Sequence, residues 1–141
     1  MTIVNYLGCN NNLPFSEDDS DDKIMIFEDF QDEKAKENVK KHFSTKFVYQ
    51  FLTLSDPSIW FNKHYKRDFP KSNLKSQESF KALCQFLDSH LREGDYCELY
   101  TCWAGDEEED RNMELDQTIY LNNFDINKIQ IYEKTLLKLK K

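Results

Sequence analysis

Residues 76–94, SQESFKALCQFLDSHLREG, carry the pattern that most limits how this chain can fold. Apolar side chains recur there at the i, i+3, i+4 and i+7 spacing of one buried helix face. Those side chains are Phe80, Leu83, Cys84, Leu87 and Leu91. Ser76 suits the start of such a helix and Gly94 suits its end. A helix with one apolar face must bury that face against a second layer.

Short runs rich in β-branched and aromatic residues predict the strands of that second layer. These runs are 3–7, 23–28, 45–54, 96–103 and 113–121. The start of 127–141 also predicts a strand, and the remainder of that segment is left open between strand and helix. Residues 32–43 predict a second, surface helix, because Ala35, Val39 and Phe43 form one narrow apolar stripe.

The order of these elements has no steady βαβ rhythm, which favours an α+β fold. We expect a mostly antiparallel sheet of about five to six strands with two main helices packed on one face. The chain has 141 residues, an ordinary size for one domain, so residues 1–141 are expected to form a single globular domain. Residues 56–75 contain two prolines and no clean period, which predicts a long, partly ordered connection.

The strands predicted at 96–103 and 113–121 are expected to form a hairpin with a long acidic tip. Successive side chains of a strand point to opposite faces of the sheet. The face that holds Leu99 is the more apolar one and is expected to face the core, together with Cys97, Thr101 and Trp103. The opposite face is then expected to look outward, and its members are Tyr96, Glu98 and Tyr100.

The four cysteines form no C-x-x-C pair, which is the local spacing of most structural zinc sites. Cys97 and Cys102 lie an odd number of positions apart, so a regular strand directs them to opposite faces, where they neither share a metal nor form a disulfide. Cys84 lies on the apolar face of the helix predicted at 76–94. We therefore expect structural cysteines.

Glycine occurs only three times, so the chain contains no phosphate-binding loop of the G-x-G-x-x-G or Walker type. His42, His64 and His90 are scattered and belong to no metal-binding or catalytic motif. These absences lead us to expect no catalytic residue, no cofactor and no metal. The alternative is a small enzyme whose active site is assembled from distant residues, with His64, Glu98 and Cys102 as candidates.

Two acidic runs hold ten of the 26 acidic residues. Adjacent carboxylates repel one another, so they stay solvated unless cations lie opposite them. The first run is Glu17, Asp18, Asp19, Asp21 and Asp22, and the second is Asp106, Glu107, Glu108, Glu109 and Asp110. The second run follows Trp103, and tryptophan is common at binding hot spots. The candidate partner-binding residues are Tyr96, Glu98, Tyr100, Trp103 and the five acids of the second run.

The net charge of −7 disfavours binding to nucleic acid or to an anionic membrane. We expect a non-catalytic domain that binds a basic protein, in its sharpest form an immunity or antitoxin protein that inhibits a cationic toxin such as a nuclease. A solvated domain of unknown role is an alternative. A weaker alternative is single-stranded nucleic acid bound by Lys63–Lys75 together with Trp60, Phe61 and Tyr65.

The start of the chain lacks the basic and apolar regions of a signal peptide, and no run approaches 18 apolar residues. We therefore expect no membrane segment and a cytoplasmic location, where thiols are normally reduced. The oligomeric state is left open.

Overall fold

The computed structural model describes residues 2–14, 24–27, 33–53 and 58–141, and in this part of the chain six strands form one sheet. In chain order the strands are β1 (Ile3–Cys9), β2 (Ile24–Phe27), β3 (Phe47–Thr53), β4 (Tyr96–Trp103), β5 (Gln117–Tyr120) and β6 (Thr135–Lys140). Their order across the sheet is β2-β3-β1-β4-β6-β5, and only the β5–β6 pair is parallel. The predicted α+β class with a mostly antiparallel sheet is confirmed.

The helices of the described residues are α1 (Glu33–Val39), α2 (Lys63–Asp68) and α3 (Pro70–His90). Three 3-10 turns accompany them: η1 (Lys40–His42), which continues α1, η2 (Met113–Leu115) and η3 (Ile126–Lys128). The long helix predicted from the apolar period is α3. It begins at Pro70 rather than at Ser76, because a proline is well tolerated in the first turn of a helix.

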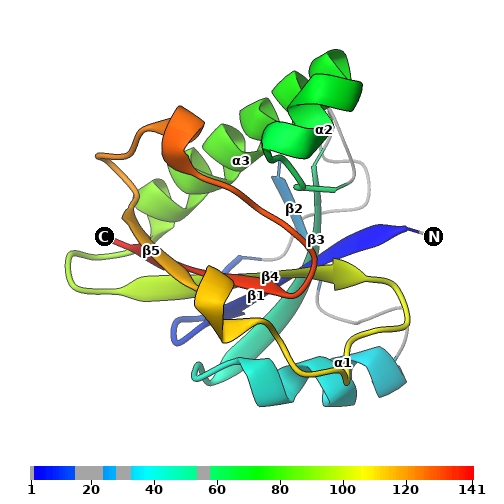
Figure 1. The fold of residues 1–141 in the computed structure, drawn as a ribbon. Helices are drawn as coiled ribbons and strands as arrows, with labels where there is room; N and C mark the ends of the chain where they lie inside the picture. Colours follow the sequence, from blue (N-terminus) through cyan, green and yellow to red (C-terminus); the bar gives the residue numbers. More distant parts are fainter. Residues whose placement is uncertain (1, 15–23, 28–32, 54–57) are drawn as a thin grey trace.

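The helices cover both faces of the sheet (Figure 1). On one face, which we call the α3 face, Leu83 and Leu87 of α3 pack against apolar side chains of β1, β4 and β6. On the other, which we call the α1 face, Val39 of α1 packs with Tyr6 and Tyr100. The two longest helices therefore lie on opposite faces and not on the single face that we expected.

The central strands β1 and β4 are buried on both of their faces. On β4, Cys97 contributes to the core of the α3 face, whereas Tyr100 and Cys102 contribute to that of the α1 face. The predicted separation of Cys97 and Cys102 is thus confirmed. The predicted outward orientation is wrong for Glu98 and Tyr100, which are 5% and 0% exposed, because a second layer covers the face that we expected to be solvated.

The predicted hairpin between 96–103 and 113–121 is also wrong. The first strand has the predicted bounds as β4, but β6 lies between β4 and β5. Consequently β5 pairs with β6 in parallel, with Gln117 opposite Leu137. A parallel pair requires a long connection, and the chain provides it by crossing the α3 face between β5 and β6.

The C-terminal segment 127–141 forms its strand at the end and not at the start, where we expected it. The start contains the end of η3 and then an extended stretch that belongs to no named strand. Ile129 and Ile131 of this stretch are nevertheless buried in the core of the α3 face. The Ile131 N–H donates to the Phe61 carbonyl at 2.7 Å, which anchors the stretch to the chain before α2.

The segment 56–75, predicted as a partly ordered connection, holds α2 and the start of α3, and its residues 56 and 57 lie outside the described part. Polar side chains fix the stretch before α2. Asn5 of β1 binds both backbone groups of Ile59, and the Ser76 hydroxyl of α3 accepts from the Trp60 N–H at 2.6 Å. Asn62 caps α2 by accepting from the Tyr65 N–H at 2.9 Å. This ordering comes from contacts between distant residues, which a search for a local period does not detect.

Candidate functional site

The acidic residues that follow β4 do not project as a hairpin tip, because the loop 104–116 folds back over the α1 face. Its anchor is Glu107, which is only 6% exposed. One carboxylate oxygen accepts from the Tyr6 hydroxyl at 2.8 Å, and the other accepts from the Gly105 N–H at 2.9 Å. The charge of Glu107 is therefore used inside the fold, where hydrogen bonds to a carboxylate are strong.

A buried histidine fixes the same turn from the helix side. His42 of η1 donates from Nε2 to the Glu107 carbonyl at 2.8 Å, and its ring stacks on Tyr100 with the ring centres 4.2 Å apart. Burial lowers the pKa of His42 below its ordinary value, with the positive charges of Lys41 and Arg111 acting in the same direction. The hydrogen bond to the Glu107 carbonyl opposes this shift.

We expect the free energy of unfolding to fall as the pH is lowered from 7.5 to 5.5. The unfolded chain protonates His42 near its ordinary pKa of about 6.5, whereas the folded chain resists protonation until a lower pH. Urea unfolding of wild type and His42→Gln at both pH values measures this, since glutamine keeps a donor but does not titrate. The fall should be smaller in the variant. An equal fall in both proteins would show that His42 does not cause it.

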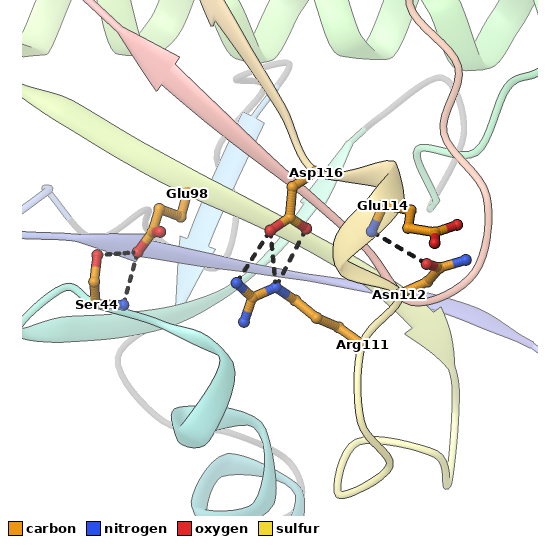
Figure 2. Close-up of polar contacts among 6 residues, drawn as sticks. All are labelled: Ser44, Glu98, Arg111, Asn112, Glu114 and Asp116. Atoms are coloured by element: carbon orange, nitrogen blue, oxygen red, sulfur yellow. Dashed lines mark hydrogen bonds and ion pairs between the residues drawn. The ribbon is translucent and has the colours of Figure 1, made fainter.

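The far end of the loop is fixed by its own side chains (Figure 2). Arg111 forms an ion pair with Asp116, with Nη2 and Oδ2 3.1 Å apart. The Asn112 side chain accepts from the Glu114 N–H at 3.2 Å and caps η2. The Asn112 N–H also donates to the Lys134 carbonyl at 3.0 Å, which joins the loop to the chain just before β6. The loop is thus anchored at both ends.

Three carboxylates remain on the surface between these anchors. They belong to Glu108, Glu109 and Asp110, which we call the acidic rim. Lys41 contacts the Glu108 carbonyl and lies 3.3 Å from Asp110, and Lys134 lies 3.5 Å from Glu109. Asp106, the first acid of the run, is half-buried. Exposed pairs of this kind contribute little to stability.

A groove of about 550 Å³ opens beside the rim on the α1 face. Its lining includes Lys34 and Asn38 of α1 and Glu107 and Glu108 of the loop. Gln50 of β3 also contributes to its wall. The volume falls in the range of ligand pockets, but the lining is more polar than is usual for a small-molecule site.

The sequence-predicted partner-binding residues do not form one surface in the structure. The exposed acids form the rim, whereas Glu98 and Tyr100 are covered. Glu98 accepts from both the N–H and the hydroxyl of Ser44 at 2.9 Å, which fixes the turn before β3 (Figure 2). Tyr96 is half-buried, with the Lys138 ammonium 4.2 Å from its ring centre. Trp103 packs towards the α3 face, away from the rim, with its ring centre 5.6 Å from that of Trp60.

A dispersed active site was considered for His64, Glu98 and Cys102. All three lie in the described part of the chain, and the structure does not bring them together. His64 is exposed on α2, which packs against α3, and its ring lies beside Tyr132. Glu98 and Cys102 lie on the opposite face of the sheet. Burial raises the pKa of the Cys102 thiol to about 12, which disfavours the thiolate that a cysteine nucleophile requires.

The segment 60–75 was considered above for binding single-stranded nucleic acid. Its aromatic residues pack mainly on one another. The ring centres of Trp60 and Tyr65 are 4.8 Å apart, and those of Tyr65 and Phe69 are 5.5 Å apart. Phe61 is buried, and Phe69 is 59% exposed. Stacking on nucleic-acid bases requires free aromatic faces, and the contacts along this row already occupy part of that surface.

No group of three His, Cys, Asp or Glu side chains within the described ranges is arranged to hold a metal ion. Among the helices of the same ranges, none has the length and apolar character needed to cross a membrane. Comparisons of the chain with protein-family models, with curated proteins and with solved structures find no significant match. The function must therefore be inferred from the site itself.

Sequence reasoning did not identify Tyr6 and His42, which hold the loop, or the different role of Glu107 within its run. A run of five acids gives no local sign of which member is buried, because that depends on residues far along the chain. Tyr6 and Glu107 are 101 positions apart in the sequence.

Proposed function

We propose that this protein is a non-catalytic binding domain that holds a basic protein through the acidic rim Glu108, Glu109 and Asp110. Its sharpest form is an immunity or antitoxin-type inhibitor that covers a cationic toxin such as a nuclease. The single observation that carries the proposal is the double anchoring of the loop. Buried Glu107 and the Arg111–Asp116 pair fix the backbone while the three rim carboxylates stay in solvent.

Anchoring supports binding because a fixed loop loses little conformational freedom when a partner arrives. A free acidic loop would have to be ordered during association, at a cost of roughly 1–2 kcal/mol for each residue whose backbone becomes fixed. The rim side chains still lose some freedom, but their backbone does not. The anchored backbone thus supports a proposal in which the three rim carboxylates meet a matching set of lysine or arginine side chains.

The charge of the rim supports fast association with a basic partner. Opposite surface charges steer two proteins together and raise the association rate, and this effect weakens as salt is added. The net charge of −7 acts in the same direction. The groove beside the rim, which Glu107 and Glu108 help to line, offers a place for one basic side chain.

The proposal predicts that neutralising the rim reduces capture of the partner. The test variant is Glu108→Gln, Glu109→Gln and Asp110→Asn, which removes three charges and keeps the size of each side chain. Tagged wild-type and variant proteins are incubated with lysate of the native host, and the bound proteins are quantified by mass spectrometry. At least one basic protein should be enriched by wild type and strongly depleted from the variant.

A matched control removes the same number of charges elsewhere. Glu78→Gln, Glu93→Gln and Asp125→Asn change three exposed acids, one on α3, one in the turn after α3 and one at the start of η3. Asparagine can still cap η3 in place of Asp125, whose side chain accepts from the Asn127 N–H at 3.0 Å. The control should capture the basic protein as wild type does. Recovery of no basic protein, or equal loss in both variants, would contradict the proposal.

A further inference from the structure

Two of the four cysteines meet directly across neighbouring strands. Cys9 at the end of β1 and Cys97 on β4 are paired in the antiparallel register. Their sulfur atoms are 2.8 Å apart, and both residues are 0% exposed. Residues directly opposite in an antiparallel pair have Cα atoms about 4.5–5.5 Å apart, and disulfides usually require about 4.4–6.8 Å. The backbone therefore already has the spacing that a bond between these sulfurs needs.

The surroundings give the two thiols unequal roles. Cys97 donates its thiol hydrogen to the sulfur of Cys9, and this contact lowers the pKa of Cys9 to about 7 against the opposing effect of burial. The same contact, together with burial, raises the pKa of Cys97. Cys9 is thus the more readily ionised of the two, and the thiolate is the form that attacks an oxidant. Cys97 lies within bonding reach to react next.

The other two cysteines lack such a partner among the described residues. Cys84 of α3 is buried in the core of the α3 face, and Cys102 is buried on the α1 face. Burial raises the pKa of each thiol to about 12. They therefore provide internal comparisons for any reaction assigned to Cys9 and Cys97.

We propose that Cys9 and Cys97 are a modification site at which a hydroperoxide converts the paired thiols into a reversible cross-strand disulfide. The Cys9 thiolate attacks one oxygen of hydrogen peroxide, the O–O bond breaks, hydroxide leaves and Cys9 becomes a sulfenic acid. The sulfur of Cys97 then attacks the sulfur of Cys9, an S–S bond forms, and the Cys97 proton leaves with the sulfenic oxygen as water. In total, two thiols and one peroxide give one disulfide and two waters.

Peroxide must reach sulfurs that are covered in the folded protein, so the reaction depends on local opening. Cys9 is the last residue of β1 and is followed by a bend at Asn10 and Asn11. Strand ends open at a lower free-energy cost than strand centres. We expect slow oxidation that stops at the disulfide, because the neighbouring Cys97 sulfur reacts before a second peroxide does. A thiol reductant such as dithiothreitol should reverse the product.

The test is mass spectrometry of the full-length reduced protein after graded treatment with hydrogen peroxide and alkylation in denaturant. Two of the four cysteines should become protected from alkylation, and digestion should yield one linked pair of peptides containing positions 9 and 97. Dithiothreitol should restore all four thiols. Protection of a different pair, links between chains, or sulfinic acid at Cys9 with free Cys97 would overturn the proposal.

Single cysteine-to-serine variants provide an additional check on which cysteines are linked. Cys9→Ser and Cys97→Ser should each abolish the protected pair, whereas Cys84→Ser and Cys102→Ser should keep it. If the Cys97→Ser variant fails to fold, the linked peptides found in the wild-type protein still decide which cysteines are joined. The oxidised protein should also unfold at a higher urea concentration than the reduced protein, because the link joins positions 88 apart in the unfolded chain. An unchanged midpoint would contradict formation of the link in the native fold.

Discussion

Replacing Asn5 by alanine is expected to lower the free energy of unfolding by about 3 kcal/mol, from the loss of its buried hydrogen bonds. Asn5 lies on β1 and is 5% exposed. Its amide nitrogen donates to the Ile59 carbonyl at 3.0 Å and to the Thr101 hydroxyl at 2.8 Å. Its amide oxygen accepts from the Ile59 N–H at 2.7 Å. One side chain therefore binds both backbone groups of a residue outside the sheet.

The effect is large because alanine leaves the Ile59 groups buried without a partner. An unsatisfied buried polar group costs roughly 1–3 kcal/mol, more than a hydrogen bond contributes on average. Ile59 itself is 0% exposed, so water does not replace the amide without local opening. The stretch between Ser58 and Asn62 should loosen, and with it the packing of Trp60 and Phe61.

Urea unfolding followed by tryptophan fluorescence measures this change, since Trp60 lies next to Ile59. Asn122→Ala, at an exposed position in the turn after β5, is the matched control and should leave the midpoint within the error of wild type. Equal midpoints for Asn5→Ala and wild type would show that the Ile59 stretch does not depend on this side chain.

The second large effect is expected from Gly8→Ala, near the end of the central strand β1. A Cβ atom at Gly8 would lie 2.5 Å from Cδ1 of Phe43 and closer still to Oγ1 of Thr45. These residues belong to the turn between η1 and β3, which crosses close over β1. Inserting atoms into a packed region costs about 1–3 kcal/mol. We therefore expect a loss of about 2 kcal/mol in the free energy of unfolding.

The sign of this effect is informative. Alanine in place of glycine usually stabilises a strand by roughly 0.5–1 kcal/mol, because glycine loses more conformational freedom on folding. A destabilised Gly8→Ala variant therefore reports the close approach of Phe43 and Thr45. Adding Thr45→Ala to the variant removes the nearest atom and should recover part of the loss. Stabilisation by Gly8→Ala, measured by the urea midpoint, would contradict this packing.

The local sequence pattern alone was sufficient to predict α3 and β4. The apolar face of α3 contains the predicted Phe80, Leu83, Cys84 and Leu87, and all four are buried. The bounds of β4 agree with the predicted strand 96–103. In both cases the signal is the spacing of apolar residues and the residues of the flanking turns. These depend only on neighbouring positions, so both elements can be predicted without knowledge of distant contacts.

The faces of β4 could not be assigned from its own residues. Alternation distinguishes a core face from a solvated face only when one face is solvated, and β4 is covered on both. Whether Glu98 is exposed depends on Ser44 and on the position of α1. The pairing of β6 between β4 and β5 is similarly a choice between distant segments, and hairpin signals favour the wrong partner.

The candidate site was predictable only in part. The sequence identifies the run 106–110 as unusual, and the structure places three of its acids on the surface. Nothing in the sequence indicates that Glu107 binds Tyr6 and Gly105, or that Trp103 packs towards Trp60. The pairing of Cys9 with Cys97 is likewise a consequence of strand register and not of spacing along the chain.

The most direct test of rim binding is the dissociation constant of the complex between this protein and the captured basic protein, measured by titration calorimetry at physiological salt. Wild type is compared with the rim variant Glu108→Gln, Glu109→Gln and Asp110→Asn and with the control variant Glu78→Gln, Glu93→Gln and Asp125→Asn. We expect the rim variant to bind about thirtyfold more weakly, or about 2 kcal/mol, and the control to stay within about twofold of wild type. Equal dissociation constants for wild type and the rim variant would contradict binding through the acidic rim.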